Sequence, residues 1–350
     1  MQDFLIQNRK IGPSAPPFII AEMSGNHNHS LERALAIVDA AAAAGAHALK
    51  LQTYTADSMT IDCEEGDFVI TDPKSLWHGR TLYDLYREAH TPWEWHKPIM
   101  DRCRKHNLIC FSTPFDVTSL NFLEELNVPC YKIASFENTD IPLIKKVAAT
   151  GKPMIISTGM ANISELAETV EAARSSGCKD LVLLKCTSSY PASPADSNLR
   201  TIPHMRDLFD VQVGLSDHTL GIGVPLASIA FGATVIEKHF TLRRKDGGVD
   251  SAFSIEPNEL ADLVQNSERA WQALGQVDYG KKGSDKKSKQ FRRSIYLIED
   301  CREGDTLTED NIRTIRPGGG MPPKYFEKVL GRKLRCSAKK GTPLSPDILV

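Results

Sequence analysis

The sequence lacks the features that would assign it to several classes of protein. No run approaches the ~20 consecutive apolar residues of a bilayer-spanning helix, and the first residues, MQDFLIQNRKIG, lack the apolar core of a signal peptide. The net charge of −2 gives no support for a nucleic-acid-binding surface. The eight cysteines form no C-x-x-C pair, which argues against disulfides and against a zinc–cysteine site. These absences predict a cytoplasmic protein with neither a membrane nor a nucleic acid as partner.

What is present describes a globular chain. Of its 350 residues, 41% are hydrophobic and 25% are charged. This length is enough for one large core and a small additional domain.

Short β-rich runs recur along the chain, each followed by a helical pattern. The runs are FIIAEM (18–23), ALKLQT (48–53), LICFST (108–113), CYKIAS (130–135), PMIIST (153–158), LVLLKC (181–186), VQVGLS (211–216) and TVIEKH (234–239). They are mostly apolar on both faces, which is typical of strands in a parallel sheet. Eight strand–helix units in roughly 250 residues predict a closed (β/α)8 TIM barrel. A doubly wound open sheet is the structural alternative.

Almost every run ends in polar or reactive residues at its C-terminal side. In chain order these are Glu22, Lys50, Gln52, Ser112, Thr113, Lys132, Ser135, Ser157, Thr158, Lys185, Thr187, Ser216, Asp217, His218, Glu237 and His239. A single Ser or Thr in this position often only caps the next helix. In a barrel, however, all eight strand ends meet at one mouth, so their repetition predicts an active site there.

The remaining segments complete the organisation. The barrel is expected to span residues 1–275. Within it, residues 54–90 are too long for an ordinary strand-to-helix loop and are expected to form a lid or a dimer contact. Residues 276–293 are rich in Lys, Gly and Ser, which predicts a solvated linker. Residues 294–350 consist of short apolar runs broken by Gly and Pro, and predict a small separate domain that depends on a neighbour.

Two histidines at neighbouring strand ends form a candidate metal site. In TVIEKH the alternation of side chains puts Glu237 and His239 on one face, and His218 lies just past the neighbouring strand. Two histidines, a carboxylate and open positions suit a divalent metal that acts as a Lewis acid. The alternative is that each histidine only forms hydrogen bonds in its loop. The His-x-His spacing of His27 and His29 can also chelate a metal, but the pair at the strand ends is better placed.

Three strand-end lysines raise a second question, because a buried ammonium group is costly without a negative partner. Lys50, Lys132 and Lys185 allow three explanations: Schiff-base chemistry, an anionic ligand, or pairing with Glu22, Glu137 and Glu237. Neighbouring Ser and Thr hydroxyls favour a phosphate or carboxylate ligand, since hydroxyl and ammonium groups both donate to oxyanions. A Schiff-base aldolase is the rival.

The ordered motifs resemble those of one enzyme family. They are IIAEMSGNHN, ALKLQTY, FSTPFD, YKIAS, ISTGM, CTSSYP, GLSDHT, IEKHFT and GVDSAFSIEP. In this order they resemble the successive motifs of the sialic acid synthase family, and the tail, with EGDTLTEDNIRTIRPGGG and VLGRKL, is similar to its C-terminal antifreeze-like (SAF) domain. CTSSYP, SLWHGRTLYDLYREAHTPWEWH and RPGGGMPPKY are more like the pseudaminic acid branch. The resemblance implies a TIM barrel followed by a small, mainly-β SAF (β-clip) domain.

The resemblance also implies a reaction. That branch condenses phosphoenolpyruvate with open-chain 2,4-diacetamido-2,4,6-trideoxy-L-altrose to give pseudaminic acid and phosphate. In the family, C3 of phosphoenolpyruvate attacks the sugar aldehyde, water adds at C2, and phosphate leaves by C–O cleavage. The implied metal is Mn2+, with Mg2+ or Co2+ as alternatives, and the implied assembly is a domain-swapped homodimer.

Site residues follow from matching the motifs one by one. Glu22, His218 and His239 are the implied catalytic residues, and the two histidines are the implied metal ligands. The residues implied to hold phosphoenolpyruvate are Lys50, Thr113, Lys132, Ser135, Ser157 and Ser216. The residues implied at the sugar end are Gln52, Glu137, Tyr190, Asp250 and Arg316, of which Arg316 reaches into the barrel of the partner subunit.

Two departures from the family pattern concern the sugar end. Ser188 stands where sialic acid synthases have Asn, and Asp250 is followed by Ser251-Ala252-Phe253 instead of a histidine-containing stretch. Both argue against N-acetylmannosamine as the substrate. The alternatives kept open are an N-acetylneuraminic or legionaminic acid synthase, a Schiff-base aldolase, and a non-catalytic carbohydrate- or ice-binding protein. Ice binding requires a flat face of small hydroxyl residues, whereas the tail carries charges and prolines.

Overall fold

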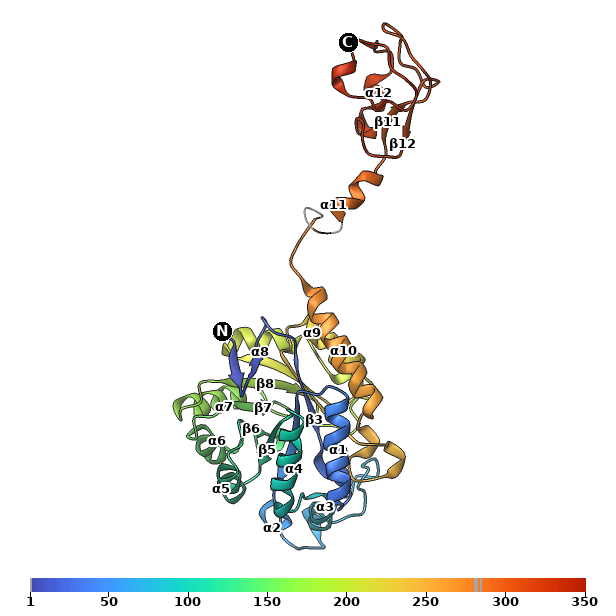
Figure 1. The fold of residues 1–350 in the computed structure, drawn as a ribbon. Coiled ribbons are helices and arrows are strands. Elements are labelled where there is room, and N and C mark those ends of the chain that lie inside the picture. The colour runs from blue at the N-terminus through green and yellow to red at the C-terminus, as the bar shows by residue number, and fades with distance from the viewer. Residues whose placement is uncertain (1, 280–282, 284) are drawn as a thin grey trace. The chain divides into compact units, whose positions relative to one another are not determined.

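The chain forms two compact units in the computed structural model, which describes residues 2–279, 283 and 285–350 (Figure 1). The first unit ends at Gly275 and the second begins at Gln276. Part of the predicted linker, residues 280–282 and 284, lies outside the described residues.

Eight parallel strands close the first unit into a barrel, and the last strand pairs with the first. The strands are β3 (Phe18–Glu22), β4 (Ala48–Thr53), β5 (Ile109–Pro114), β6 (Tyr131–Ile133), β7 (Met154–Ser157), β8 (Leu181–Cys186), β9 (Gln212–Asp217) and β10 (Val235–His239). The closing register runs from Val235 opposite Phe18 to His239 opposite Glu22. The predicted TIM barrel is therefore confirmed, and the open-sheet alternative is wrong because this sheet has no free edge.

Helices cover the outside of the barrel, as the alternating pattern predicts. They are α1 (Leu31–Ala43), α4 (Trp93–Lys105), α5 (Val117–Glu125), α6 (Ile141–Ala148), α7 (Ile163–Ser175), α8 (Thr201–Phe209), α9 (Gly223–Ala230) and α10 (Pro257–Leu274). Local signals set their ends: the Ser30 and Asp116 side chains accept hydrogen bonds from the first turns of α1 and α5. In the described part of the chain, none of the helices is long and apolar enough to span a membrane.

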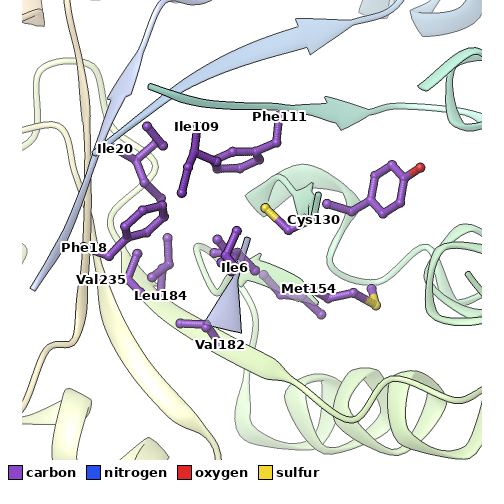
Figure 2. Close-up of a cluster of buried hydrophobic side chains, with 14 of the residues drawn as sticks. Ile6, Phe18, Ile20, Ile109, Phe111, Cys130, Met154, Val182, Leu184 and Val235 are labelled. Atoms are coloured by element: carbon purple, nitrogen blue, oxygen red, sulfur yellow. The ribbon is translucent and has the colours of Figure 1, made fainter. Parts of the chain in front are cut away.

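The amino-terminal end of the barrel is filled with apolar side chains. A hairpin of β1 (Phe4–Ile6) and β2 (Arg9–Ile11) precedes the barrel. Figure 2 shows Ile6 among Phe18, Val182 and Val235, which lie at the beginnings of their strands. Side chains alternate along a strand, so the same inward face that begins with Val235 continues to Glu237 and His239. At the carboxyl ends of the strands, the polar side chains on this face therefore point into the barrel.

The long segment between β4 and α4 folds over the carboxyl-terminal side of the barrel. It contains α2 (Ala56–Met59), a short 3-10 helix (Gly66–Phe68) and α3 (Leu82–Ala89). A β-bridge between Val69 and Thr81 closes the loop that precedes α3.

The second unit has its own small core. An antiparallel pair, β11 (Ser294–Leu297) and β12 (Ile312–Ile315), is accompanied by α11 (Asp285–Ser288) and α12 (Phe326–Val329). Its buried apolar residues are Ile295, Leu297, Cys301, Leu307, Ile312, Val329, Leu334, Leu344 and Leu349. The predicted small β domain after the barrel is confirmed.

Candidate active site

Four charged side chains meet inside the mouth of the barrel. Three of them come from the neighbouring strands β10, β3 and β4, and the fourth, Lys132, comes from β6 across the barrel. Lys50 Nζ contacts the Glu22 carboxylate and lies 3.5 Å from Glu237 Oε1, and Lys132 Nζ lies 3.7 Å from the same Glu237 oxygen. All four residues are buried. Strand register explains the first contact, because Glu22 lies directly opposite Lys50 on β4 and opposite His239 on β10. The predicted pairing of strand-end lysines with carboxylates is therefore present for Lys50 and Lys132.

Burial and pairing shift the pKa values of this cluster in different directions. Burial raises the pKa of Glu22 to about 7, against the opposing effect of Lys50. Burial would also raise the pKa of Glu237, but Lys132 and Lys50 outweigh it and lower that pKa. Burial lowers the pKa of Lys132, whereas Glu22 and Glu237 overcome the effect of burial on Lys50 and raise its pKa. A proton on Glu22 near neutral pH leaves two lysines facing one carboxylate, which favours an anionic ligand.

Hydroxyl groups surround the two lysines. Lys132 Nζ donates to Ser157 Oγ at 2.6 Å, and Lys50 Nζ donates to Thr113 Oγ1 at 3.3 Å. Ser216 Oγ donates to Glu237 Oε1 at 3.2 Å. The structure thus brings together five of the six residues predicted to hold phosphoenolpyruvate.

The sixth residue, Ser135, begins the 3-10 helix after β6 (Ser135–Glu137) and accepts a hydrogen bond from the Gly159 amide at 3.2 Å. Gly159 belongs to the loop after β7, and a Cβ at this position would lie 2.7 Å from Ser135 Oγ. Only glycine allows this close approach between the two strand ends. Asn138 holds the same loop by donating to the carbonyl oxygens of Ser157 and Gly159 at 3.2 and 3.1 Å.

Lys185 does not belong to the cluster. It alternates with Leu184 and Cys186, whose side chains are buried, and its own side chain is half-buried. Its Nζ donates to the Cys186 carbonyl at 2.8 Å and to Thr187 Oγ1 at 3.4 Å. The expectation that three strand-end lysines share one environment is wrong, because strand alternation separates this lysine from the other two.

The two predicted metal ligands lie side by side at the mouth. The ring centroids of His218 and His239 are 5.3 Å apart. His218 Nδ1 is 2.9 Å from the carbonyl oxygen of Thr187, and since a carbonyl can only accept, Nδ1 carries the proton. In the neutral ring this hydrogen bond leaves Nε2 of His218 with a lone pair, as a metal ligand requires. Burial would lower the pKa of His218, but the neighbouring Cys186 thiol outweighs burial and raises it, so a metal would have to displace a proton from this ring.

His239 also fits the role of a metal ligand. Burial lowers its pKa well below the usual range, so the ring is neutral. Its buried Nδ1 has no hydrogen-bond partner in the described part of the chain, and the nearest carboxylate oxygen, from Asp250, is 4.0 Å away. Among the described residues, no three His, Cys, Asp or Glu side chains form a ready-made metal site. Two histidines would therefore hold a metal that keeps open positions for oxygen ligands.

The residues predicted at the sugar end line a cavity of about 440 Å³ that also borders His239, with one exception. Those in the cavity wall are Gln52, Glu137, Tyr190 and Asp250, together with Ser24, Ser135 and His239. Burial raises the pKa of Glu137 to about 7, and one of its carboxylate oxygens is unpartnered among the described residues. The exception is Arg316, which belongs to the second unit, directly after β12, and is exposed there.

Phe253, which belongs to the stretch that departs from the family pattern, packs against the histidine pair. Its ring centroid is 4.9 Å from that of His239 and 6.2 Å from that of His218. The Tyr190 ring lies 4.5 Å from His218 and 5.2 Å from Phe253. Aromatic rings therefore hold both imidazoles in place.

His27 and His29 make contacts within and beside the loop after β3, away from the candidate metal site. His27 is fully buried, and its Nδ1 accepts a hydrogen bond from the His29 amide at 3.2 Å. Its Nε2 lies 3.3 Å from Thr91 Oγ1. Burial lowers the pKa of His27 to about 4, so the ring is neutral and connects the loop after β3 to the residues before α4.

Comparisons with known proteins agree with this geometry. Residues 37–279 match the NeuB family and residues 292–350 match the SAF domain. The chain is 42% identical to the pseudaminic acid synthase of Campylobacter jejuni over 330 residues, which covers 93% of this chain and 95% of that one. It is 41% identical to the pseudaminic acid synthase of Helicobacter pylori, over 95% of this chain and 97% of the relative.

More distant relatives include a synthase for another acid and a solved structure. The chain is 34% identical to an N,N'-diacetyllegionaminic acid synthase of Campylobacter jejuni, covering 90% of this chain and 94% of that one. The crystal structure of an N-acetylneuraminic acid synthetase from Leptospira borgpetersenii, in complex with citrate, is similar with a TM-score of 0.74 and 35% identity. That match covers 82% of this chain and 95% of the other.

Proposed function

The chain belongs to the NeuB family, and from this membership we propose that it is a pseudaminic acid synthase. The reaction is the condensation of phosphoenolpyruvate with open-chain 2,4-diacetamido-2,4,6-trideoxy-L-altrose, which yields pseudaminic acid and phosphate. The observation that carries the proposal is the buried cluster of Lys50, Lys132 and Glu237 with its hydroxyl groups, directly beside the histidine pair. The identity of 41–42% to two pseudaminic acid synthases over nearly the whole chain supports the choice of sugar.

The lysine cluster would hold the phosphoenolpyruvate end. Lys50 and Lys132 supply positive charge to the phosphate and carboxylate, and Thr113, Ser135, Ser157 and Ser216 supply short-range hydroxyl donors. The anion would replace the contacts that these groups now make with one another. Binding in this buried setting fixes the enol carbon near the histidine pair and excludes water from the phosphate.

A divalent metal, Mn2+ with Mg2+ or Co2+ as alternatives, would be held by His218 and His239 and would supply Lewis-acid polarisation of the sugar aldehyde. Glu22 lies in register between Lys50 and His239, at the junction of the two ends of the site. Its pKa of about 7 allows it to give or take a proton near neutral pH. We assign to it the proton movements that accompany C–C bond formation and the addition of water at C2.

We also propose that the active enzyme is a homodimer in which Arg316 of the partner subunit completes the sugar end. Three large apolar side chains at the mouth support a covering partner: Phe136 after β6, Met160 after β7 and Leu220 after β9 are 62%, 64% and 63% exposed. Large apolar side chains that are exposed on three of the loops around the mouth suit a covering partner. All eight cysteines are free thiols, which supports a cytoplasmic location.

A Schiff-base aldolase is the second candidate, because burial lowers the pKa of Lys132, as amine nucleophiles require. Borohydride reduction in the presence of pyruvate separates the two functions. A synthase leaves Lys132 unmodified, whereas an aldolase shows a stable adduct on that lysine by mass spectrometry.

The direct test of the proposed function is a side-by-side assay of phosphate release. The purified chain is incubated with Mn2+, phosphoenolpyruvate and one of three sugars: the altrose derivative, N-acetylmannosamine or the legionaminic acid precursor. The proposal requires the highest kcat/KM with the altrose derivative. A higher value with either other sugar would reassign the substrate, and no release with any of them would refute the function.

A further inference from the structure

The cavity at the mouth has two chemically different sides. The barrel side carries the polar residues of the site, together with Phe115, Ala134, Phe136 and Val249. The other side is formed by the segment between β4 and α4, and every side chain that this segment contributes is apolar or aromatic. We call these residues the apolar wall: Tyr54, Met59, Ile70, Trp77, Leu82, Leu85, Tyr86 and Ala89.

Helix α3 explains how a surface segment comes to present this wall. Its residues Leu82, Leu85, Tyr86 and Ala89 follow the i, i+3, i+4, i+7 spacing and therefore share one helix face. The other face is charged, and Glu88 on it pairs with Arg80 at 2.6 Å. The apolar face of this helix thus borders a cavity, where a ligand can cover it.

The wall is fixed to the catalytic end of the barrel. Trp77 Nε1 donates a hydrogen bond to the Val249 carbonyl at 3.0 Å, next to Asp250, and the Trp77 ring lies 5.8 Å from Tyr190. Tyr54 packs edge-on against Tyr86 at 5.9 Å and against Phe115 at 5.1 Å. These contacts set the position of the wall before any ligand binds.

We propose that the apolar wall determines substrate specificity by recognising a 6-deoxy sugar that carries acetamido groups. This inference rests on the proposed synthase function. The aldehyde end of the open-chain sugar is held at the histidine pair, so the opposite end of its carbon chain faces the segment that forms the wall.

Recognition follows from desolvation. A C6 methyl group and the methyl groups of the acetamido substituents gain from burial against Met59, Ile70 and Leu85. A C6 hydroxyl placed against Met59, Ile70 and Leu85 would instead lose its hydration, because these aliphatic side chains offer it no partner and the Trp77 N–H is already donated to Val249. The hydroxyls of Tyr54 and Tyr86 are the other polar groups of the wall, so we place the C6 methyl group at the aliphatic side chains. The wall therefore favours the deoxy sugar over the same sugar with a hydroxymethyl group.

The test compares two substrates that differ at one atom: 2,4-diacetamido-2,4,6-trideoxy-L-altrose and its 6-hydroxy counterpart. For the unmodified chain, kcat/KM for the deoxy sugar should exceed that for the hydroxy sugar by roughly 10- to 100-fold. Apolar pockets discriminate by about this factor between substrates that differ in one small group. In Ile70→Thr, which puts a hydroxyl into the wall, the ratio should fall to within about threefold of unity while the KM for phosphoenolpyruvate stays unchanged.

Ile61→Thr is the matched control, because Ile61 lies in the same segment, is 60% exposed and does not line the cavity. It should keep the ratio of the unmodified chain. Met59→Gln is a second wall variant, in which the new side chain is about as long as the one it replaces. It should also lower the ratio, and it keeps the inference testable if Ile70→Thr does not fold.

Two outcomes distinguish a failure of this inference from a failure of the proposed synthase function. Turnover of both sugars with a ratio that neither wall variant changes would overturn the inference and leave the synthase function standing. No turnover with any acetamido sugar would overturn both.

Discussion

Lys238 and Asp217 form a buried ion pair of 2.6 Å on the outer side of the strands that carry the candidate metal ligands. Lys238 precedes His239 on β10, and Asp217 precedes His218 at the end of β9. Asp217 also accepts hydrogen bonds from the amide and hydroxyl of Thr219 at 3.3 and 3.0 Å. The pair thus ties the residue before His239 to the residues on both sides of His218.

The first prediction concerns this ion pair. Lys238→Met leaves the Asp217 carboxylate buried without its cation, and we expect a loss of about 3–5 kcal/mol in the free energy of unfolding. Urea denaturation followed by circular dichroism measures it. Lys185→Met, which removes a half-buried lysine from the neighbouring strand, should cost much less. Equal losses in the two variants would show that the pair contributes nothing specific.

The second prediction concerns the hydroxyl beside Lys132. Ser157→Ala removes the acceptor 2.6 Å from Lys132 Nζ, and we expect the KM for phosphoenolpyruvate to rise about tenfold, the effect of one lost hydrogen bond to a charged group. The KM for the sugar should change little. Thr158→Val is the matched control, because the Thr158 hydroxyl donates to the Leu184 carbonyl instead. A rise confined to the sugar KM would contradict the assignment of the two ends.

The third prediction concerns stability in acid. Burial lowers the pKa of His96 to about 4, below its ordinary value of 6.5, so in the folded protein the ring stays neutral where an unfolded chain would take up a proton. The stability from this residue is complete above pH 6.5 and is lost as the pH falls toward 4. At pH 5 the loss amounts to about 2 kcal/mol relative to neutral pH.

The measurement for this prediction is the free energy of unfolding at pH 7.5 and pH 5. His96→Gln should be less stable at neutral pH, since it breaks the 2.7 Å contact with Thr53, but its stability should fall less between the two values. His78→Gln, at an exposed position, should keep the pH dependence of the unmodified chain. An unchanged difference between the two pH values in His96→Gln would refute the assignment.

The fourth prediction concerns the second unit. A chain that ends at Gly275 should still unfold cooperatively, because the barrel has its own core, but it should lose turnover through loss of Arg316. In the full chain, Arg316→Ala should lower kcat/KM for the sugar by roughly 10- to 100-fold, as expected when a charged hydrogen bond is removed. Arg313→Ala, at another exposed position of the same unit, should have little effect. Full activity of the truncated barrel would contradict the swapped homodimer.

Much of the fold and of the site follows from the alternation of side chains within strands. It predicts that Glu237 and His239 point into the barrel, and it groups Lys50 with Gln52. The same rule, applied to Leu184 and Cys186, would have set Lys185 apart from the other lysines, because neighbours on a strand face opposite sides.

Other parts of the site depend on contacts between distant segments, which local patterns do not contain. Trp77 meets Val249 across 172 positions of the chain, and Gly159 matters only because Ser135 approaches it. In the sequence, nothing distinguishes Asn138 from other loop residues or Lys238 from other strand residues. Their contacts exist only in the closed barrel.

We propose that the mouth of this barrel joins phosphoenolpyruvate to a diacetamido sugar. The most direct test is nuclear magnetic resonance of the product formed from phosphoenolpyruvate labelled with carbon-13 at C3, Mn2+ and 2,4-diacetamido-2,4,6-trideoxy-L-altrose. We expect a nine-carbon acid with the label in its C3 methylene group and one equivalent of phosphate. Label that remains in phosphoenolpyruvate or appears only in pyruvate, with this sugar and with the other two, would contradict it.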